Sequence, residues 1–390
     1  MDNEYAFQAI QSVLSSSQAY CKFISANDSG ATGGHQSGIL ISRSAEEMLF
    51  SEKLADHNIL KRAVHIKWQG DFTTESSFTY YRSKGEFRIT RFGRDFPFLV
   101  PAQTGALFVL TRQDADDYSA FFLDTDDEID TFLNAFCMSP TETNRLIDPH
   151  RIVPETREQM AIQEFIANLD VDFPTSGAMS EAARMIQHQI FNHAEEVRTN
   201  PDKKIIAWTN TEFALFRALE DARYGNRVRA GFPSVDEFVD MANMVMNRRK
   251  SRAGKSFENQ LSAIFDGNDI TYTAQAITEG NKRPDFLFPS ADAYHDATYP
   301  VDRLVSLAAK TTCKDRWRQV INEANRLRNR PKFLCTLQQG ISPAQMDEMQ
   351  EENVTLVVPR SFIGYYPADR RERIWTVAKF IHYIREIETN

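Results

Sequence analysis

The sequence predicts a mostly β N-terminal domain followed by an α/β domain with a mixed five-stranded sheet flanked by helices. Up to about residue 135, short apolar segments alternate with turn residues, which is typical of a β barrel or sandwich. Beyond about residue 270, short apolar strands are interleaved with helical segments, which is typical of α/β domains. A chain of 390 residues also fits two domains better than one.

The predicted strands of the N-terminal domain are short apolar runs. They cover residues 38–41, 63–66, 78–81 and 106–110. Breaker residues around Asp148 and Phe173 enclose a helical segment at 157–169. We therefore expect a linker at 161–172, with residues 1–160 and 173–390 as the two domains.

Helical periodicity dominates the next ninety or so residues. The predicted helices cover 180–197, 211–224, 234–247 and 255–266. Ser234-Val-Asp-Glu237 has the spacing of a capping box, which fixes one helix start. Five strands then follow at 272–275, 284–288, 304–310, 332–337 and 354–358, with helices at 314–328, 342–352 and 371–387.

The charge is unevenly distributed along the chain. Residues 1–170 hold 15 basic and 25 acidic residues, whereas the remainder hold 30 and 29. Much of the acidity lies between Asp114 and Asp130, which we interpret as a solvated loop and strand edge facing away from DNA. The C-terminal half can therefore approach a phosphate backbone, although the net charge is −9.

A possible hydrolytic site begins at Asp285 and Lys310, which are predicted on neighbouring strands. Phosphodiester hydrolysis needs oxygen ligands for Mg²⁺ and a group that positions the attacking water. Lys310 ends an apolar strand, where an ammonium group is costly without a partner or a function. The alternative interpretation is a structural ion pair between the two residues.

Nucleases of the PD…(D/E)xK type carry a second carboxylate two residues before the lysine, where this chain has Ala308. Glu323 can replace it. The next predicted helix starts beside Lys310 and packs its apolar stripe on the sheet, and Glu323 borders that stripe, so its carboxylate can reach the same metal. We expect Asp285 and Glu323 to bind the metal and Glu258 to orient the lysine or a water. An exposed glutamate on a helix face is the alternative for Glu323.

Two basic segments could contact DNA in the C-terminal half. Lys314, Asp315 and Arg316 could read G·C pairs in the major groove, although Asp315 could simply complement a helix dipole. A run without acids is predicted to contact phosphates through Arg248, Arg249, Lys250, Arg252 and Lys255. Its Gly-Lys-Ser does not form a P-loop, because Arg249 stands where the first glycine is needed.

A third basic cluster lies in the N-terminal domain. Arg82, Lys84, Glu86 and Arg88 alternate along the chain and are predicted to share one face of a strand. One acid among bases suits base reading beside phosphate neutralisation. The cluster predicts a second DNA-binding surface, with the glycine-rich turn before His35 as a further candidate.

The sequence resembles the EcoRII-type (type IIE) restriction endonucleases along nearly its whole length. The matching strings are Ser25-Ala-Asn-Asp28, Gly30-Ala-Thr-Gly-Gly-His35-Gln36, Asn247-Arg-Arg-Lys-Ser-Arg-Ala-Gly-Lys-Ser256, Gln275-Ala-Ile-Thr-Glu-Gly-Asn-Lys-Arg-Pro-Asp-Phe-Leu-Phe-Pro-Ser290 and Ala309-Lys-Thr-Thr-Cys-Lys-Asp-Arg-Trp-Arg318. The resemblance implies a restriction-endonuclease-like fold for the C-terminal domain and a β pseudo-barrel for the N-terminal domain.

The resemblance also implies residue roles. It assigns catalysis to Glu258, Asp285, Lys310 and Glu323, and base recognition to Lys314, Asp315 and Arg316. It implies a CCWGG-like target, where W is A or T, cut before the first C, with the central pair flipped out. Trp208 is a candidate to stack on a flipped base.

Family members act as homodimers, and their N-terminal domain binds a second copy of the site as an effector and restrains the catalytic half. That role falls on His35, Arg82, Lys84, Glu86 and Arg88. A restriction enzyme would further imply a companion DNA methyltransferase acting on the same site, without a stable complex.

Two other functions remain open: a DNA-repair or mobile-element nuclease with structure-directed cutting, and a two-site DNA-binding protein without nuclease activity. No segment has the length of a membrane span, and we expect a cytoplasmic protein. The four scattered cysteines fit a reducing compartment and are predicted to be small apolar fillers. No histidine pair has metal-ligand spacing, which argues against zinc.

Overall fold

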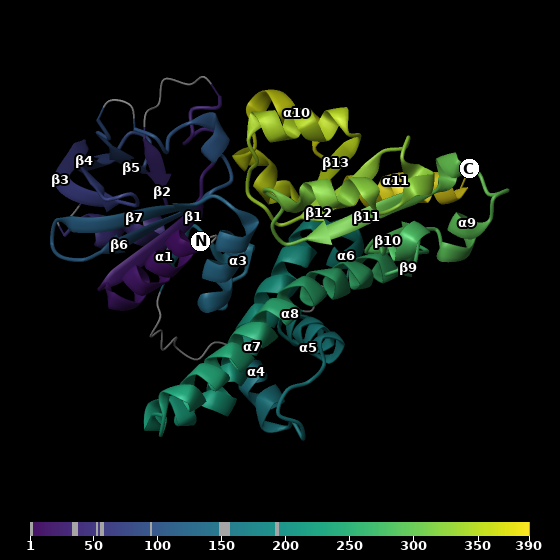
Figure 1. Cartoon of the computed structure of the whole chain (residues 1–390), viewed down its shortest axis with the longest axis horizontal. Coiled ribbons are helices and arrows are strands. Elements are labelled where there is room, and N and C mark those ends of the chain that lie inside the picture. Colours follow the sequence, from purple (N-terminus) through teal and green to yellow (C-terminus); the bar gives the residue numbers. More distant parts are fainter. Residues whose placement is uncertain are drawn as a thin grey trace.

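The computed structural model has a β-rich N-terminal part beside a second part that combines long helices with a smaller sheet (Figure 1). It describes residues 3–32, 38–51, 54, 58–93, 96–147, 157–191 and 195–389. The predicted fold class is confirmed for both parts, since an eight-stranded sheet precedes a mixed five-stranded one. No helix among the described residues is long and apolar enough to cross a membrane.

The N-terminal sheet curls around an aromatic core. Its strand order is β2-β5-β4-β3-β7-β6-β1-β8. Trp68 lies at the centre of the core, with Phe96 and Phe108 among the rings around it. The strands are β1 Gln18–Phe23, β2 Ile39–Ile41, β3 Ile59–Trp68, β4 Phe72–Tyr81, β5 Glu86–Thr90, β6 Leu107–Arg112, β7 Asp117–Leu123 and β8 Arg145–Ile147.

Two helices cover the outer face of this sheet. They are α1, Glu4–Ser15, and α3, Asp126–Ala135, and their apolar residues pack on β1, β6 and β7. Thr125 caps α3 by accepting a hydrogen bond from the backbone N–H of Glu128. α3 lies between this sheet and the C-terminal part of the chain (Figure 1), and Asp126 in its first turn accepts a hydrogen bond from the Lys314 N–H.

The helical layer that follows is longer and more continuous than predicted. It comprises α4 Arg157–Ala167, α5 Ser176–Phe191, α6 Glu196–Thr199, α7 Pro201–Ala230 and α8 Val235–Gly267. The prediction of separate helices at 234–247 and 255–266 was wrong, because α8 runs without a break. A glycine such as Gly254 costs a helix only about 1 kcal/mol, too little to interrupt one that packs along much of its length.

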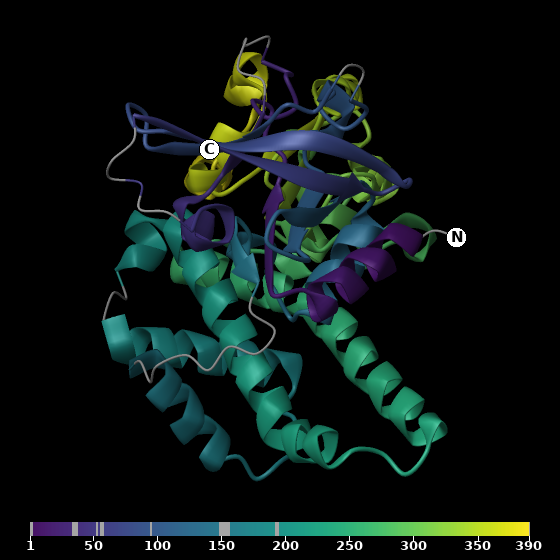
Figure 2. The same ribbon diagram turned by 90° about the vertical axis from the view of Figure 1, so that its left-hand side faces the viewer.

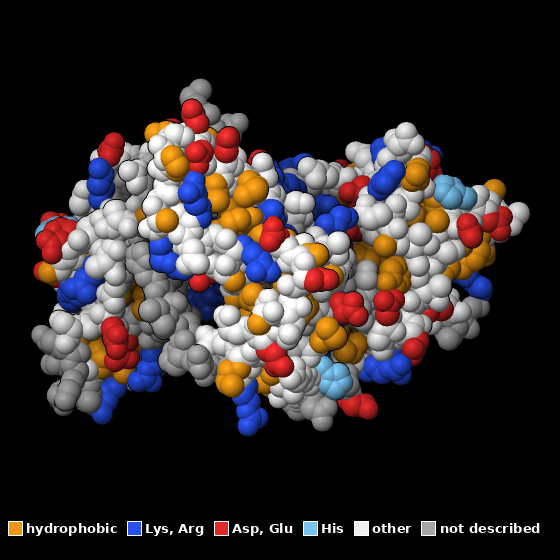
Figure 3. Space-filling view, turned by 90° about the horizontal axis from the view of Figure 1, so that it is seen from below, with side chains coloured by type: hydrophobic (Ala, Val, Ile, Leu, Met, Phe, Trp, Pro, Cys, Tyr) orange, Lys and Arg blue, Asp and Glu red, His pale blue; other side chains and the backbone are white. Residues whose placement is uncertain are grey.

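The predicted cap of α8 is present, since Ser234 accepts a hydrogen bond from the N–H of Glu237. The C-terminal end of α7 and the N-terminal end of α8 project away from both sheets (Figure 2). Hydrophobic side chains are exposed between charged ones on the face seen from below (Figure 3).

The predicted linker contains part of α4, whose Ile162 and Ile166 pack on α5 and α7. The limits of the two domains stay a prediction.

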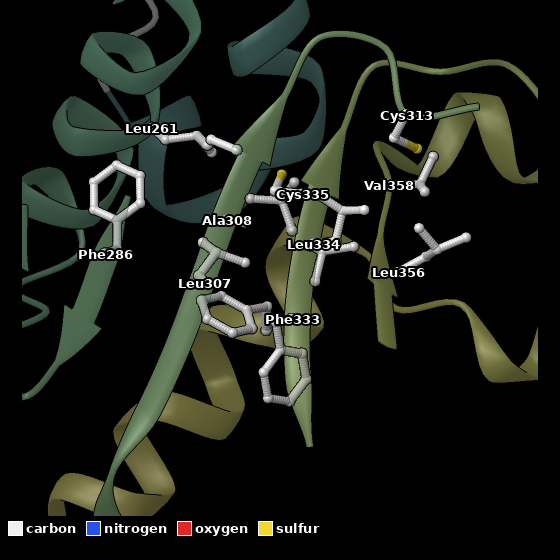
Figure 4. Close-up of a cluster of buried hydrophobic side chains, with 14 of the residues drawn as sticks. Leu261, Phe286, Leu307, Ala308, Cys313, Phe333, Leu334, Cys335, Leu356 and Val358 are labelled. Carbon is white, nitrogen blue, oxygen red and sulfur yellow. The ribbon is translucent and has the colours of Figure 1, made fainter. Parts of the chain in front are cut away.

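The C-terminal sheet supports the candidate site. Its order is β13-β12-β11-β10-β9; β11, β12 and β13 are parallel, and β9 and β10 are antiparallel to their neighbours. Both faces of its central strands are buried, and Leu261 of α8 packs against them (Figure 4). The strands are β9 Thr273–Ala274, β10 Phe286–Phe288, β11 Val305–Lys310, β12 Lys332–Thr336 and β13 Val354–Val357.

The helices around this sheet differ from the prediction mainly at one segment. α10 Pro343–Glu351 lies within the predicted segment 342–352, and α11 Val377–Thr389 begins inside the predicted segment 371–387 and ends two residues beyond it. The predicted α-helix at 314–328 is wrong: two 3₁₀ helices, η7 Arg316–Asn322 and η8 Asn325–Leu327, replace it. Ala324 breaks the run at φ −142° and ψ 88°. The Glu323 carbonyl accepts a hydrogen bond from the Thr278 hydroxyl instead of a helical N–H, which helps to end η7.

The apolar stripe predicted for this segment is nonetheless buried. Trp317, Val320, Ala324 and Leu327 are each at most 3% exposed. The four cysteines are also buried and free, as predicted. The apolar pattern therefore determined which side chains face the core, although it did not determine the type of helix.

Candidate active site and DNA-recognition loop

Asp285 and Lys310 lie side by side at the middle of the C-terminal sheet. Asp285 directly precedes β10 and Lys310 ends β11, and the antiparallel pairing of Phe286 with Leu307 brings them together. The Lys310 Nζ lies 3.3 Å from the Asp285 Oδ2, which also accepts a hydrogen bond of 2.7 Å from the Ala309 N–H. A carboxylate that is 6% exposed is thus held by one backbone donor and one ammonium group.

Glu323 directly follows η7. Burial raises the pKa of Glu323 to about 7; the Lys310 charge opposes this rise and the Asp285 charge adds to it. Asp285 and Lys310 are thus in contact, and Glu323 lies within electrostatic range of both. The metal-binding role of Glu323 stays a prediction.

Glu258 joins this group through a residue that sequence reasoning missed. The Gln275 Nε2 donates to the Glu258 Oε2 and to the Asp285 Oδ1, both at 2.9 Å. The Lys255 Nζ donates to the same Glu258 oxygen at 2.9 Å. No charge or spacing pattern distinguishes a single glutamine, although Gln275 begins one of the strings that carry the family resemblance.

The donor set suits a hard divalent cation. Mg²⁺ commonly uses one or two protein carboxylates and completes its octahedron with water and phosphate oxygens. Asp285 and Glu258 offer two linked carboxylates, and Glu323 lies nearby. Among the described residues no three His, Cys, Asp or Glu side chains form a ready-made metal cage. Ala308, which stands where a further carboxylate would be expected, is buried in the apolar core.

The predicted recognition triplet contacts the N-terminal domain. The Asp126 carboxylate at the start of α3 accepts hydrogen bonds from the N–H groups of Lys314, Asp315 and Arg316 at 2.7–2.9 Å. The Lys314 ammonium pairs with Asp124. The Arg316 guanidinium lies 2.6 Å from Asp130 and 3.1 Å from Asp127.

For the second half of the acidic run, these contacts correct the expectation that it is solvated and faces away from DNA, whereas Asp114, Asp116 and Asp117 are exposed as predicted. Asp126 is fully buried, and four acids of the run bind the residues predicted to read DNA. Burial of acids is tolerated here because basic groups and backbone N–H donors neutralise them. The sequence could not show this, because the partners are nearly two hundred residues apart.

Only part of the predicted phosphate-contact segment faces solvent. Lys250 and Lys255 are exposed. Arg252 is 4% exposed and lies between the rings of Phe213 and Phe216, 4.2 and 4.3 Å from their centroids. Its position does not fit the predicted phosphate contact, because aromatic faces and the buried Glu212 surround it.

The two other arginines of the segment have structural partners. The Arg249 guanidinium binds Glu220 and donates to the carbonyls of Asn134 and Ala135 at the end of α3. The Arg248 guanidinium lies 3.8 Å from the centroid of the Phe173 ring. Either would have to leave these partners in order to reach DNA.

Trp208 is 6% exposed and belongs to the core below the sheet. Cationic groups of Arg184 and Lys204 lie 5.9 and 5.8 Å from its ring centroid. A flipped base could stack on this ring only after these side chains move. The stacking role stays a prediction.

The predicted effector cluster is divided between a turn and a strand. Arg82 and Lys84 are exposed in the turn between β4 and β5, where Gly85 has φ +61°. Arg88 on β5 is 4% exposed and pairs with Glu86 at 3.1 Å. The expectation that all four share one strand face was wrong, because the turn occupies residues 82–85. His35 lies outside the described residues.

Comparisons with known proteins agree with this architecture. Residues 216–381 match the family described as EcoRII C terminal, and residues 13–138 match the family described as Restriction endonuclease EcoRII, N-terminal. The type II restriction enzyme EcoRII of Escherichia coli is 36% identical over 386 residues, which cover 93% of this chain and 92% of the relative. The type II restriction enzyme SsoII of Shigella sonnei is 30% identical over 126 residues, covering 30% of this chain and 40% of that protein.

Among solved structures, metal-depleted Ecl18kI in complex with uncleaved, modified DNA has a TM-score of 0.47 at 22% identity, covering 61% of this chain and 86% of that one. The PspGI–substrate DNA complex has a TM-score of 0.46 at 16% identity, covering 56% and 94%. The sequence matches define a type II restriction endonuclease, a site-specific deoxyribonuclease. The chain belongs to the EcoRII family.

Proposed function

We propose that this endonuclease cuts double-stranded DNA at a CCWGG-like site with Mg²⁺ held by Asp285 and Glu323. The observation that carries the proposal is the contact between the Asp285 carboxylate and the Lys310 ammonium group; the charges of both residues also influence the pKa of Glu323. In this arrangement the carboxylates bind the cation, which supplies Lewis acidity at the scissile phosphate. The Lys310 ammonium positions the attacking water or stabilises the developing negative charge.

Recognition of the target is assigned to Lys314, Asp315 and Arg316, with Lys250 and Lys255 as phosphate contacts. In the present conformation hydrogen bonds and ion pairs join this triplet to the acidic start of α3. Duplex DNA and α3 would therefore compete for the same basic groups. This competition supports a restraining role for the N-terminal domain, relieved when a second copy of the site binds it through exposed groups such as Arg82 and Lys84.

A homodimer fits a short target of this kind, because a nearly palindromic site presents the same face to two catalytic centres. The projecting ends of α7 and α8 offer an apolar surface. Val228, Val235 and Phe238 are 60%, 76% and 53% exposed there and would be available to contact a second subunit. A companion methyltransferase would protect the same site in the host DNA.

Digestion of a plasmid with Mg²⁺ distinguishes the candidate functions. Discrete fragments whose ends map to CCWGG support the proposal, structure-dependent nicks indicate a repair nuclease, and gel retardation alone indicates a DNA-binding protein. Asp285→Asn and Lys310→Met should abolish cleavage and retain DNA binding. Asp302→Asn, an exposed acid away from the site, is the matched control. Unchanged cleavage in both site variants would refute the catalytic assignment.

A further inference from the structure

We propose that Gln275 is a positioning residue that sets the Mg²⁺ affinity of the active site, by holding the Glu258 and Asp285 carboxylates at the spacing that one hydrated cation needs. The inference rests on the proposed function, because it assumes that Asp285 binds the cation. It adds a residue that carries no charge and that no catalytic pattern includes. Its basis is the position of one amide nitrogen between two carboxylates.

The geometry limits how far apart the two carboxylates can be. The Gln275 Nε2 has two hydrogens, and one can be donated to each acid, at 2.9 Å in both cases. The Glu258 Oε2 and the Asp285 Oδ1 are therefore no more than twice that distance apart. Ligand oxygens of Mg²⁺ lie about 2.1 Å from the ion. Two oxygens bound directly to one ion are at most about 4.2 Å apart, so at the wider separation that the amide permits one carboxylate can bind the ion directly and the other through a coordinated water.

The two acids depend on Gln275 to different extents. Asp285 is also fixed by the Ala309 N–H and by Lys310. Among the residues that the structure describes, the other partner of the Glu258 Oε2 is the half-exposed Lys255 on the same helix. Without the amide, like-charge repulsion would turn Glu258 toward Lys255 while Asp285 stays in place. The loss of Gln275 should therefore act through Glu258.

The backbone of Gln275 supports a functional role. Its φ is +52°, in the left-handed region that L residues other than Asn and Asp rarely adopt. Its N–H donates to the Asp285 carbonyl at 3.0 Å, so that Asp285 is held by both the backbone and the side chain of one residue. Strained residues of this kind cluster at functional sites. Glycine would fit the backbone better, but it could not join the two acids.

Gln275→Met tests the proposal, because it keeps the length of the side chain and removes the donor. The half-saturating Mg²⁺ concentration for plasmid cleavage should rise about tenfold, and kcat at saturating Mg²⁺ should stay within about threefold. Mn²⁺ binding without DNA, followed by electron paramagnetic resonance, should weaken by a similar factor. Gln187→Met removes another buried glutamine hydrogen bond, to Thr211, and should change neither quantity. A shift below twofold in Gln275→Met, or an equal shift in the control, overturns the proposal.

A double-mutant cycle tests the route through Glu258. Glu258→Gln should weaken Mn²⁺ binding in the wild-type background and have little further effect beside Gln275→Met. Independent, additive effects would contradict a shared action. Should Gln275→Met not fold, Gln275→Glu gives a second test: its thermal midpoint should be lowered without divalent ions and restored by Mg²⁺. Equal destabilisation with and without Mg²⁺ overturns the proposal. If the wild-type protein did not cleave the plasmid, or if Asp285→Asn still did, the proposed function itself would instead be refuted.

Discussion

Asp126 and Asp315 cap each other's helices across the contact between the two halves of the chain. The Asp126 Oδ2 accepts a hydrogen bond from the Asp315 N–H at 2.7 Å, and the Asp315 Oδ1 accepts one from the Asp126 N–H at 3.3 Å. Asp126 begins α3, and Asp315 directly precedes η7. Two helix N-termini thus face one another, and each aspartate accepts hydrogen bonds from backbone N–H groups at the start of the other helix.

Loss of the Asp126 carboxylate should weaken the restraint on the catalytic half. Asp126→Asn removes one of the negative charges near Lys314 and Arg316 and disturbs the three backbone hydrogen bonds that the carboxylate accepts, so α3 should leave the triplet more often. Cleavage of a plasmid with a single target site should become roughly tenfold faster, which corresponds to about 1.4 kcal/mol. Asp114→Asn, in the exposed β6–β7 turn, is the matched control. Equal or slower cleavage by Asp126→Asn would contradict the restraint.

The interdomain contact should weaken as the pH rises through about 6. The hydrogen bond to Asp126 and burial raise the pKa of Asp315 to about 6. Burial favours a higher pKa for Asp126, but hydrogen bonds from Asp315 and from backbone N–H groups outweigh it and lower the pKa. The raised pKa of Asp315 gives stability that is full below its ordinary value of 3.8 and is lost as the pH passes 6. The lowered pKa of Asp126 gives stability that is lost in acid, so the contact is strongest between about pH 4 and 6.

Hydrogen exchange at residues 314–316 measures this pH dependence. The amides that donate to Asp126 should lose protection between pH 5 and 7, after correction for intrinsic exchange rates. Asp315→Asn should flatten the profile. Charged groups facing the pair are Asp124, Asp127 and Asp130 of the N-terminal part and Lys314 and Arg316 of the loop. Burial also raises the pKa of Asp130, so a profile unaffected by Asp315→Asn would assign the titration to a group other than Asp315.

The sequence predicted those parts of the fold that local patterns determine. β11, for example, is a run of apolar residues ending in Lys310, and it was found where the pattern placed it. The interdomain contact was misjudged, because Asp126 and Asp315 are 189 positions apart and both look like exposed acids in isolation. Gln275 was missed for a related reason: its role depends on a backbone with φ +52° between two acids from different elements.

Truncation of Leu307 should destabilise the domain that carries the site. Leu307 is 1% exposed at the centre of β11, among Phe286 and Phe333 (Figure 4). Removing its side chain leaves a cavity in a packed core, which typically costs 2–5 kcal/mol. The midpoint of urea unfolding should fall accordingly for Leu307→Ala. Leu14→Ala, at a position 61% exposed on α1, should change it by less than about 0.5 kcal/mol. Similar midpoints for the two variants would contradict the packing seen around β11.

Neighbouring substitutions at Arg249 and Lys250 should have opposite effects. Arg249 holds the end of α3 through the carbonyls of Asn134 and Ala135, so Arg249→Met should loosen the restraint and speed cleavage of a single-site plasmid. Lys250 is exposed on the same helix. Lys250→Met should instead weaken DNA binding at all sequences and reduce the dependence of log affinity on log salt by about one unit.

Titrations of DNA binding at several salt concentrations, together with single-site cleavage rates, measure both effects. Because the two positions are adjacent on α8, any general weakening of that helix would affect both variants in the same direction. A slower Arg249→Met enzyme with a reduced salt slope would show that Arg249 contacts phosphate directly. Arg249 would then exchange its hydrogen bonds to α3 for a phosphate contact when DNA binds.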